Sequence, residues 1–162
     1  MVGQISALRR YARALVGDPT RADDLVQDCL ERAWSRSHLF RRGRDVRTWL
    51  FTILHNIYVD GVRQRGRQPA ILPLAEDIEH LSVRPAQEDA AEISDLGHAL
   101  AELPADQAAA VLLVGLEGMS YRDAATVLGV PVGTLMSRLY RGRESLRALV
   151  ADDRRVRLKR VK

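Results

Sequence analysis

"SYRDAATVLGVPVGTLMSRLYRGR" spans Ser120–Arg143 and predicts two short helices separated by a tight turn. Ser120 is a favoured N-cap residue, and Asp123 follows three residues later, at the position of a capping-box acid. Gly129 suits the left-handed conformation that ends many helices, and Pro131 suits the first turn of the next one. This order predicts a helix-turn-helix, a DNA-binding unit whose second helix enters the major groove.

The second of these helices has an apolar face and a polar face at about 100° per residue. Short polar groups and arginines on the polar face suit base edges and phosphates. The alternative is a structural helix pair whose polar face is simply solvated. The apolar face consists of Val132, Leu135, Leu139, Gly142, Leu146 and Leu149, and the opposite face of Gly133, Thr134, Met136, Ser137, Tyr140, Arg141 and Glu144.

Apolar residues recur at helical spacing along most of the chain, which predicts an all-α protein. Cys29 is the single cysteine, so no disulfide can form within the chain. The histidines have no metal-ligand spacing with Cys29, and we find no nucleophile–base pair or phosphate-binding loop. We therefore expect neither an enzyme nor a cofactor or metal. No apolar run reaches membrane-spanning length and no signal peptide is evident, so we expect a cytoplasmic protein without membrane insertion.

The charges divide the chain into four segments. Residues 1–67 carry 13 basic and 7 acidic groups, a net charge of +6, whereas residues 68–92 carry 1 and 6, a net charge of −5. Residues 93–151 carry 5 and 6, and residues 152–162 carry 6 and 2. The acidic segment also contains three prolines, which disfavour helix. We predict two small helical domains joined by a flexible acidic linker, followed by a basic tail.

Three helices are expected in the first segment. One fits Gln4–Val16, which a glycine follows, and Asp18 and Pro19 are start signals for the next. Asp45 can cap a third helix, which we expect to dissolve near Gly61–Gly66. The second helix carries an apolar stripe of Ala22, Leu25, Val26, Cys29, Leu30, Ala33 and Trp34.

The second module is expected to begin near Ile93 with an amphipathic helix. Pro104 opens a further helix that runs to Leu116. After Val150 the tail is rich in charge, so we expect it to fray.

Three stretches together resemble one family. MSYRDAATVLGVPVGTLMSRLYRGRESLR looks like the C-terminal promoter-reading domain of extracytoplasmic-function (ECF) sigma factors. ADDLVQDCLERAW, residues 22–34, resembles the polymerase clamp-binding helix of that family. RTWLFTILHNIYVDGVRQRGR, residues 47–67, resembles the family's minus-ten-reading and melting segment. The order and spacing agree over about residues 4–150.

The resemblance implies a two-domain initiation factor whose partners are core RNA polymerase and promoter DNA. Residues 1–67 would bind the clamp, recognise the minus-ten element and help to melt it. Residues 93–151 would recognise the minus-thirty-five element, and the linker, 68–92, would thread the polymerase cleft. An acidic face opposite a buried stripe suits a basic partner, although a solvated face is the alternative. The residues that match the clamp-binding motif are Asp24, Leu25, Gln27 and Asp28.

Asn56 matches the position at which such factors hold an extruded minus-ten base, in a pocket completed by the loop Phe40–Asp45. An amide can pair with a base edge, which suits the capture of an unstacked base. Trp49 fits the apolar face, and Met136 departs from the basic residue often found at its position. Further residues implied on the minus-ten side are His55, Asp60, Arg63 and Arg65, with Arg63, Arg65 and Arg67 as phosphate contacts, and those on the minus-thirty-five side are Thr134, Ser137, Arg138, Tyr140, Arg141 and Arg143.

Members of this family are usually held inactive by an anti-sigma factor, and the resemblance leads us to expect one here. Two other functions stay open. A stand-alone helix-turn-helix regulator would explain the second module but not the clamp motif. A sigma-like decoy that titrates an anti-sigma factor would have no need of DNA-facing residues such as Asn56 and Arg141, which are present.

Overall fold

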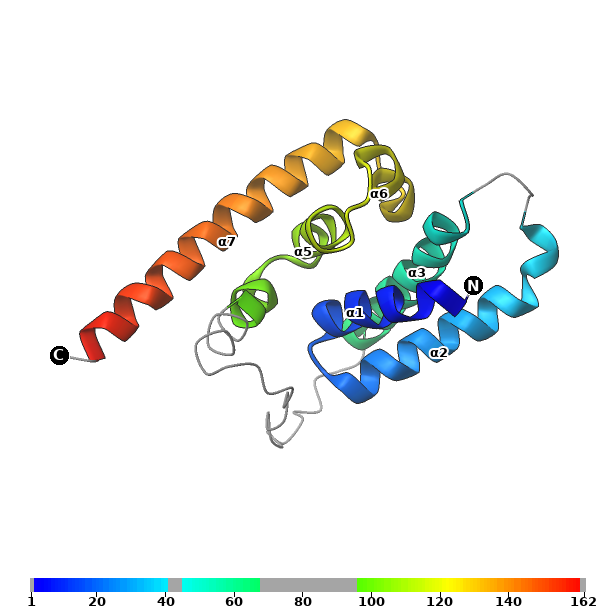
Figure 1. Ribbon diagram of the computed structural model, residues 1–162, viewed down its shortest axis with the longest axis horizontal. Helices are drawn as coiled ribbons and strands as arrows, with labels where there is room; N and C mark the ends of the chain where they lie inside the picture. Colours follow the sequence, from blue (N-terminus) through cyan, green and yellow to red (C-terminus); the bar gives the residue numbers. More distant parts are fainter. Residues whose placement is uncertain (1, 41–44, 68–95, 161–162) are drawn as a thin grey trace.

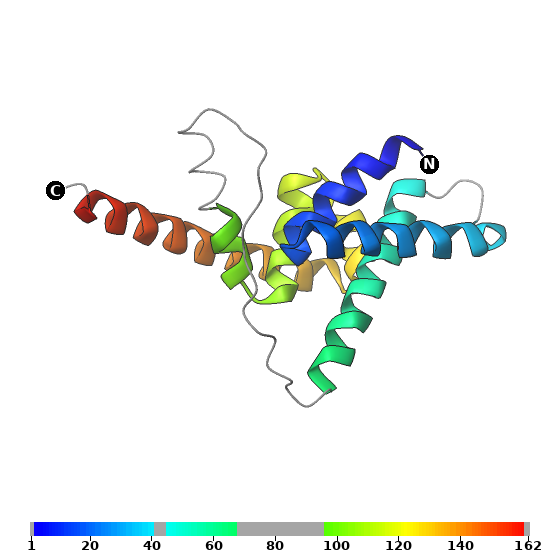
Figure 2. The same ribbon diagram turned by 90° about the horizontal axis from the view of Figure 1, so that it is seen from below.

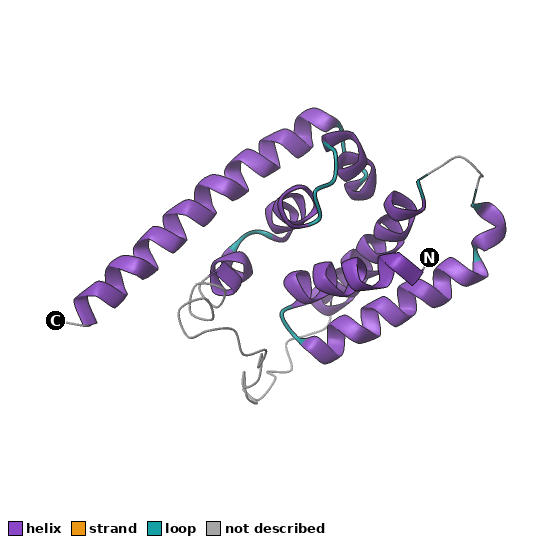
Figure 3. Ribbon diagram, in the orientation of Figure 1, coloured by secondary structure: helices purple, strands orange, loops and turns teal. Residues whose placement is uncertain are grey.

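The computed structural model describes residues 2–40, 45–67 and 96–160, and within these ranges it contains helices and no strand (Figure 3). The predicted all-α class is therefore confirmed. The linker predicted at 68–92 lies outside the described residues, as does most of the expected pocket loop. The elements are α1 (Ile5–Val16), α2 (Pro19–Ser35), α3 (Val46–Arg67), a helical segment at 96–102, α5 (Ala105–Val111), a π-helix (Leu112–Leu116), α6 (Tyr121–Leu128) and α7 (Val132–Arg160), with 3-10 turns at Val2–Gln4 and Ser37–Leu39.

The predicted boundaries of the first helices are confirmed by their caps. Gly17 ends α1 in the left-handed region, with φ of 78°. The Asp18 side chain accepts a hydrogen bond of 2.6 Å from the backbone N–H of Arg21 at the start of α2. The Asp45 carboxylate accepts bonds from the backbone and the hydroxyl of Thr48 at 3.0 and 2.8 Å, and these bonds lower the pKa of Asp45.

The helix-turn-helix forms as its sequence predicts. The Ser120 hydroxyl accepts a hydrogen bond of 3.1 Å from the backbone N–H of Asp123, and this cap starts α6. Gly129 ends α6 with φ of 64°, a conformation that a side chain would oppose. After this turn α7 begins at Val132, and its side chains Leu135 and Leu139 are buried in the core.

The two halves of the chain lie against each other (Figure 1). Helices α1, α2 and α3 pack together, α5 and α6 pack on α7, and α3 lies against α6. Side chains from both halves belong to one buried cluster, in which Tyr11 and Phe51 come from the first half and Leu113 and Leu135 from the second. The described helices therefore share a continuous apolar core.

Three expectations about the helices are wrong. Helix α3 does not dissolve near Gly61–Gly66 but continues to Arg67, since the arginines and glutamine around the glycines are good helix formers. Helix α7 continues beyond Val150 to Arg160, through a tail rich in arginine, which is a good helix former. Trp34 is 78% exposed instead of buried, because the last turn of α2 lies at the end of the bundle.

Gly142 lies at a close contact between α7 and α5. A Cβ atom at this position would lie 2.8 Å from Val111 Cγ2 and 3.2 Å from the carbonyl oxygen of Gln107. Gly142→Ala is expected to lower the free energy of unfolding by about 1–3 kcal/mol through overpacking, measured by urea unfolding. Gly133→Ala is the matched control, because Gly133 lies in the same helix with open space around it. Equal stability of the two variants would contradict this packing.

Candidate nucleic-acid interface

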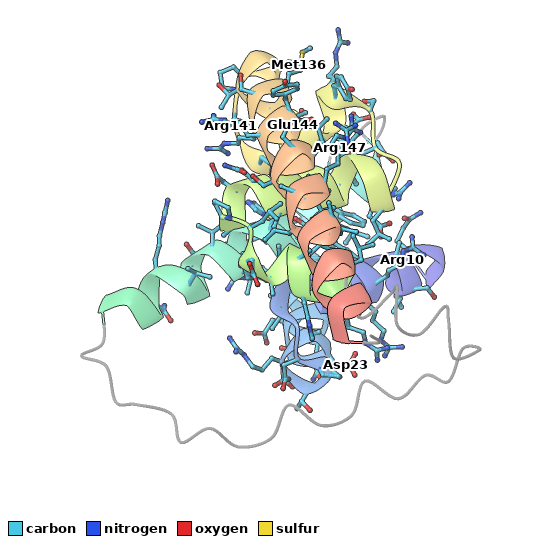
Figure 4. The ribbon with its side chains drawn as sticks, turned by 90° about the vertical axis from the view of Figure 1, so that its left-hand side faces the viewer. Arg10, Asp23, Met136, Arg141, Glu144 and Arg147 are labelled. Atoms are coloured by element: carbon cyan, nitrogen blue, oxygen red, sulfur yellow. The ribbon has the colours of Figure 1, made fainter. Side chains whose placement is uncertain are left out.

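The N-terminal half of α7 presents an exposed polar face with two large apolar side chains. Ser137 and Arg141 lie one turn apart on this face, and the guanidinium Nε of Arg141 donates to the Ser137 carbonyl at 3.3 Å. Tyr140 is 69% exposed and Met136 is 50% exposed. Figure 4 shows Met136 and Arg141 projecting from this half of α7. Side chains of this kind can reach base edges, phosphates and thymine methyl groups.

Two residues expected on the same face lie elsewhere. Arg138 turns toward α5, where its Nε lies 3.1 Å from a carboxylate oxygen of Asp106, and its side chain is only 25% exposed. Thr134 is half-buried. Arg143 is exposed as expected. The polar arc of α7 is therefore narrower than the sequence alone indicates.

The C-terminal half of α3 projects away from the other helices (Figure 2). Asp60 and Arg63 are exposed on it, and Asn56 is exposed at the middle of the helix, so the amide of Asn56 is free to meet a base. The side chains of Arg65 and Arg67 lie outside the described part of the structure. Trp49 is partly buried and stacks at an angle on Phe40, with ring centroids 5.0 Å apart, in agreement with its expected place in the core.

His55 is not on the exposed face of α3 where it was expected. It is 9% exposed, and its Nδ1 lies 3.3 Å from the hydroxyl of Tyr11 on α1. One residue along a helix turns the side chain by about 100°, so Asn56 faces solvent while His55 faces α1. Burial, and secondarily the positive charge of Arg138, lowers the pKa of His55 to about 4.

The free energy of unfolding is expected to depend on pH through His55. Because its folded pKa lies below the ordinary value of 6.5, the unfolded chain binds the proton more readily. The stabilisation is present above pH 6.5 and is lost as the pH falls toward 4, by about 3 kcal/mol in all. The groups around it are Tyr11 on α1, Tyr58 on α3 and Arg138 on α7.

Urea unfolding between pH 7 and pH 4 checks this expectation. His55→Asn should remove most of the slope between pH 6.5 and 4.5, since asparagine does not titrate. His98→Asn is the matched control, because His98 is exposed. A slope that survives His55→Asn would assign the acid sensitivity to other groups.

The acidic residues of α2 form an exposed face, as the sequence predicts. Asp24, Gln27 and Asp28 are exposed, whereas Leu25 is only 8% exposed. Leu25 nevertheless lines a shallow hollow of about 240 Å³ between α2 and α3, beside the two carboxylates. A partner side chain could contact Leu25 only by entering this hollow. The other lining residues are Val16, Arg21, Ile57, Tyr58 and Gly61.

Sequence reasoning missed the buried ion cluster of Glu117 with Arg10 and Arg47. Both carboxylate oxygens of Glu117 bind guanidinium groups, and its side chain is fully buried. The signal in the sequence is a single acid inside the apolar run LLVGLEGM. Its partners could not be identified in this way, because they lie 107 and 70 residues away.

The described ranges hold no group of three His, Cys, Asp or Glu side chains arranged for a metal ion. No helix in them is long and apolar enough to cross a membrane. Cys29 is buried, and burial raises the pKa of its thiol to about 12, so it is a packing residue with little thiolate character.

Comparison with family models matches both halves of the chain separately. Residues 1–55 match the model of the Sigma2 domain of PhyR, and residues 93–146 match that of sigma-70 region 4. The two matches lie on either side of the acidic segment, and the second covers the helix-turn-helix.

Individual relatives match nearly the whole chain. The ECF RNA polymerase sigma factor EcfG of Rhodopseudomonas palustris is 39% identical, over 94% of this chain and 84% of that protein. The ECF RNA polymerase sigma factor RpoE of Cereibacter sphaeroides is 34% identical, over 79% of this chain and 71% of that protein. Among solved structures, the sigma factor RpoE of Bartonella quintana, in complex with the anti-sigma factor NepR, is 37% identical over 93% of each chain, with a TM-score of 0.79.

Proposed function

Because the chain belongs to the ECF family of RNA polymerase sigma factors, we propose that its exposed α2 surface binds core polymerase and that its exposed α3 and α7 surfaces recognise the promoter. A member of this family directs core polymerase to promoters and is a DNA-binding regulatory subunit rather than an enzyme. It acts in the cytoplasm, where the polymerase is. Residues 1–67 form the first functional module and residues 93–151 the second, with residues 68–92 as the linker and 152–162 as a basic tail.

The exposed acidic face of α2 binds the clamp of core polymerase. Asp24, Gln27 and Asp28 offer carboxylate and amide oxygens to a basic partner, and charge complementarity of this kind raises association rates and selects partners. Leu25 adds an apolar contact only through the hollow beside them.

The projecting half of α3 reads the minus-ten element. Asn56 pairs with an extruded base, and Arg63 contacts the phosphates of the separated strands. Asp60 lies exposed beside them. Arg65 and Arg67 extend the basic line along the sequence. His55 supports this segment from the inside through Tyr11 and does not touch DNA while it is buried.

The N-terminal half of α7 reads the minus-thirty-five element. Arg141 and Arg143 supply guanidinium groups for guanine edges and phosphates, and Ser137 supplies a hydroxyl beside them. Tyr140 and Met136 offer apolar surface to thymine methyl groups. Thr134 is half-buried and Arg138 pairs with Asp106, so neither side chain is positioned to contact DNA in this arrangement.

An anti-sigma factor controls the activity of this chain. Support comes from the Bartonella quintana sigma factor, which was solved with the anti-sigma factor NepR and matches this chain over 93% of its length. Affinity capture with the intact chain from its own cells should recover a small protein that competes with core polymerase. Capture of polymerase alone, under inducing and non-inducing conditions, would count against this control.

One observation favours a second function, that of a decoy. The first half of the chain matches the Sigma2 domain of PhyR, and the anti-anti-sigma factor PhyR of Bartonella quintana has been solved in complex with the anti-sigma factor NepR. That structure is 18% identical and supports the fold alone. The exposed Asn56 and Arg141 favour the sigma-factor function, because a decoy has no need of DNA-reading side chains.

The observation that carries the proposal is the presence, on one chain, of an exposed Asn56 and an exposed helix-turn-helix face. DNA binding with and without core polymerase tests it, measured by fluorescence anisotropy on promoter and scrambled duplexes. A sigma factor should discriminate between the duplexes only when core polymerase is present. Discrimination by the chain alone would indicate a stand-alone regulator, and no discrimination in either case a decoy.

A further inference from the structure

Glu117 connects three separate elements in one buried ion cluster. Its Oε1 and Oε2 accept hydrogen bonds of 2.9 and 2.8 Å from the guanidinium of Arg10, a paired geometry that is among the strongest for these groups. Arg47 donates from one nitrogen to Oε2 at 3.0 Å and to the Glu117 carbonyl at 2.6 Å. The Glu117 side chain is fully buried, so its negative charge is stabilised by these two guanidinium groups and not by water.

The backbone around Glu117 holds the carboxylate in place. The preceding turn is the π-helix Leu112–Leu116, and the N–H of Glu117 donates to the Leu112 carbonyl at 3.0 Å. Gly118 then reverses the chain with φ of 62°. A π-turn followed by a left-handed glycine is an uncommon local geometry, and such turns often mark functional positions.

The cluster crosses from one DNA-reading module to the other. Arg10 lies in α1 and Arg47 at the start of α3, whereas Glu117 lies three residues before the cap of α6. His55 is buried against Tyr11 of α1, within its own module. Arg138 of α7, from the other module, is close enough to lower the pKa of His55. The two modules are therefore joined both by the shared apolar core and by the ion cluster of Glu117 with Arg10 and Arg47.

The joined arrangement cannot read a promoter. The minus-ten and minus-thirty-five elements are centred about 25 base pairs apart, or about 85 Å along B-form DNA. Helices α3 and α6 are in direct contact, and α7, with 29 residues, is only about 44 Å long. The modules must separate before α3 and α7 can lie on their two elements together.

We propose that Glu117, Arg10 and Arg47 form an intramolecular latch that holds the free chain closed and inhibits its own assembly with polymerase and promoter. This regulation rests on the sigma-factor function proposed above. It requires no second protein, so it sets a basal level of inhibition on which any anti-sigma factor would act.

The latch is also built to open. Arg10 keeps 52% of its side chain exposed and Arg47 keeps 32%, so water can replace Glu117 when the modules part. Arg47 Nε is buried without an acceptor among the described residues, which means that closure leaves one donor unsatisfied. Closure therefore carries a built-in cost, and a binding partner that prefers the open form can shift the equilibrium.

Distances between the modules test the latch directly. Spin labels at Thr20→Cys in α2 and Ser145→Cys in α7 occupy exposed positions, while Cys29 is buried. Glu117→Gln and Arg10→Gln should each raise the population of long label distances about tenfold in pulsed electron paramagnetic resonance. Arg9→Gln is the matched control, because the neighbouring Arg9 is 56% exposed and pairs within its own module with Asp23 at 3.5 Å.

The inhibitory effect is measured by titration of core polymerase. If only the open form binds, the apparent dissociation constant falls by the same factor as the open population rises, about tenfold for Arg10→Gln. Arg9→Gln should bind as the unmodified chain does. Circular dichroism confirms that each variant is folded, and Arg10→Gln keeps the test valid if Glu117→Gln does not fold.

Two results would overturn the latch. One is an unchanged distance distribution in both variants, and the other is an opened chain whose affinity for polymerase is unchanged relative to Arg9→Gln. If the unmodified chain and Arg9→Gln fail to bind polymerase at all, the proposed function fails, whereas the label distances still report whether the cluster closes the molecule.

Discussion

Replacing Asn56 by alanine is expected to reduce run-off transcription by about tenfold to a hundredfold while binding of core polymerase stays unchanged. Asn56 is exposed at the middle of α3, where its amide can pair with an extruded base. Opening a base pair costs a few kcal/mol, and the contact between the extruded base and the Asn56 amide offsets part of this free energy. Loss of the contact therefore slows melting by about tenfold to a hundredfold.

A premelted template separates base capture from general damage. With mismatched base pairs across the minus-ten element, Asn56→Ala should recover much of its lost activity, because strand separation no longer limits the reaction. Ser6→Ala, an exposed polar residue on α1, serves as the control and should transcribe normally from both templates. Full activity of Asn56→Ala on the duplex template would refute the role of this residue.

The double charge reversal Asp24→Lys with Asp28→Lys is expected to weaken binding to core polymerase by at least about a hundredfold. Both carboxylates are exposed on one face of α2, beside the hollow that Leu25 lines. Reversal removes two favourable charge contacts and adds like-charge repulsion against a basic partner, at about 3 kcal/mol or more in total. The fold should persist, because neither side chain is buried.

The measurement is a binding titration with fluorescently labelled core polymerase at two salt concentrations. Glu102→Lys matches the change of sign at an exposed acid of the other module and should leave the affinity within about twofold. The defect of the double variant should shrink at high salt, since exposed charges are screened. An affinity equal to that of Glu102→Lys would remove α2 from the polymerase interface.

Local signals in the sequence predicted most of the helix boundaries. The caps at Asp18, Asp45 and Ser120 and the left-handed glycines at 17 and 129 act within three or four residues, so they can be read from the chain alone. The polar arcs of α2 and α7 follow from the helical period in the same way. The period also placed Ser137 and Arg141 on an exposed surface, where the structure has them, whereas Asn56 was assigned only through the family resemblance.

Contacts between distant segments could not be predicted in this way. His55 and Arg138 were assigned to DNA through the family resemblance, yet one is buried against Tyr11 and the other pairs with Asp106. Glu117 attracted no role, since its partners are far away in the sequence. Periodicity gives the angle at which a side chain leaves its helix, but not which other helix will cover it.

Core polymerase should become a promoter-specific enzyme when it binds this chain. Run-off transcription on a pool of genomic promoter fragments, with and without the chain, tests this function most directly. We predict new discrete transcripts that depend on the chain and that fall by at least about tenfold with Arg141→Ala as well as with Asn56→Ala. If the chain binds polymerase but a complete pool of promoter fragments yields no new transcript, this function is contradicted and a decoy is favoured.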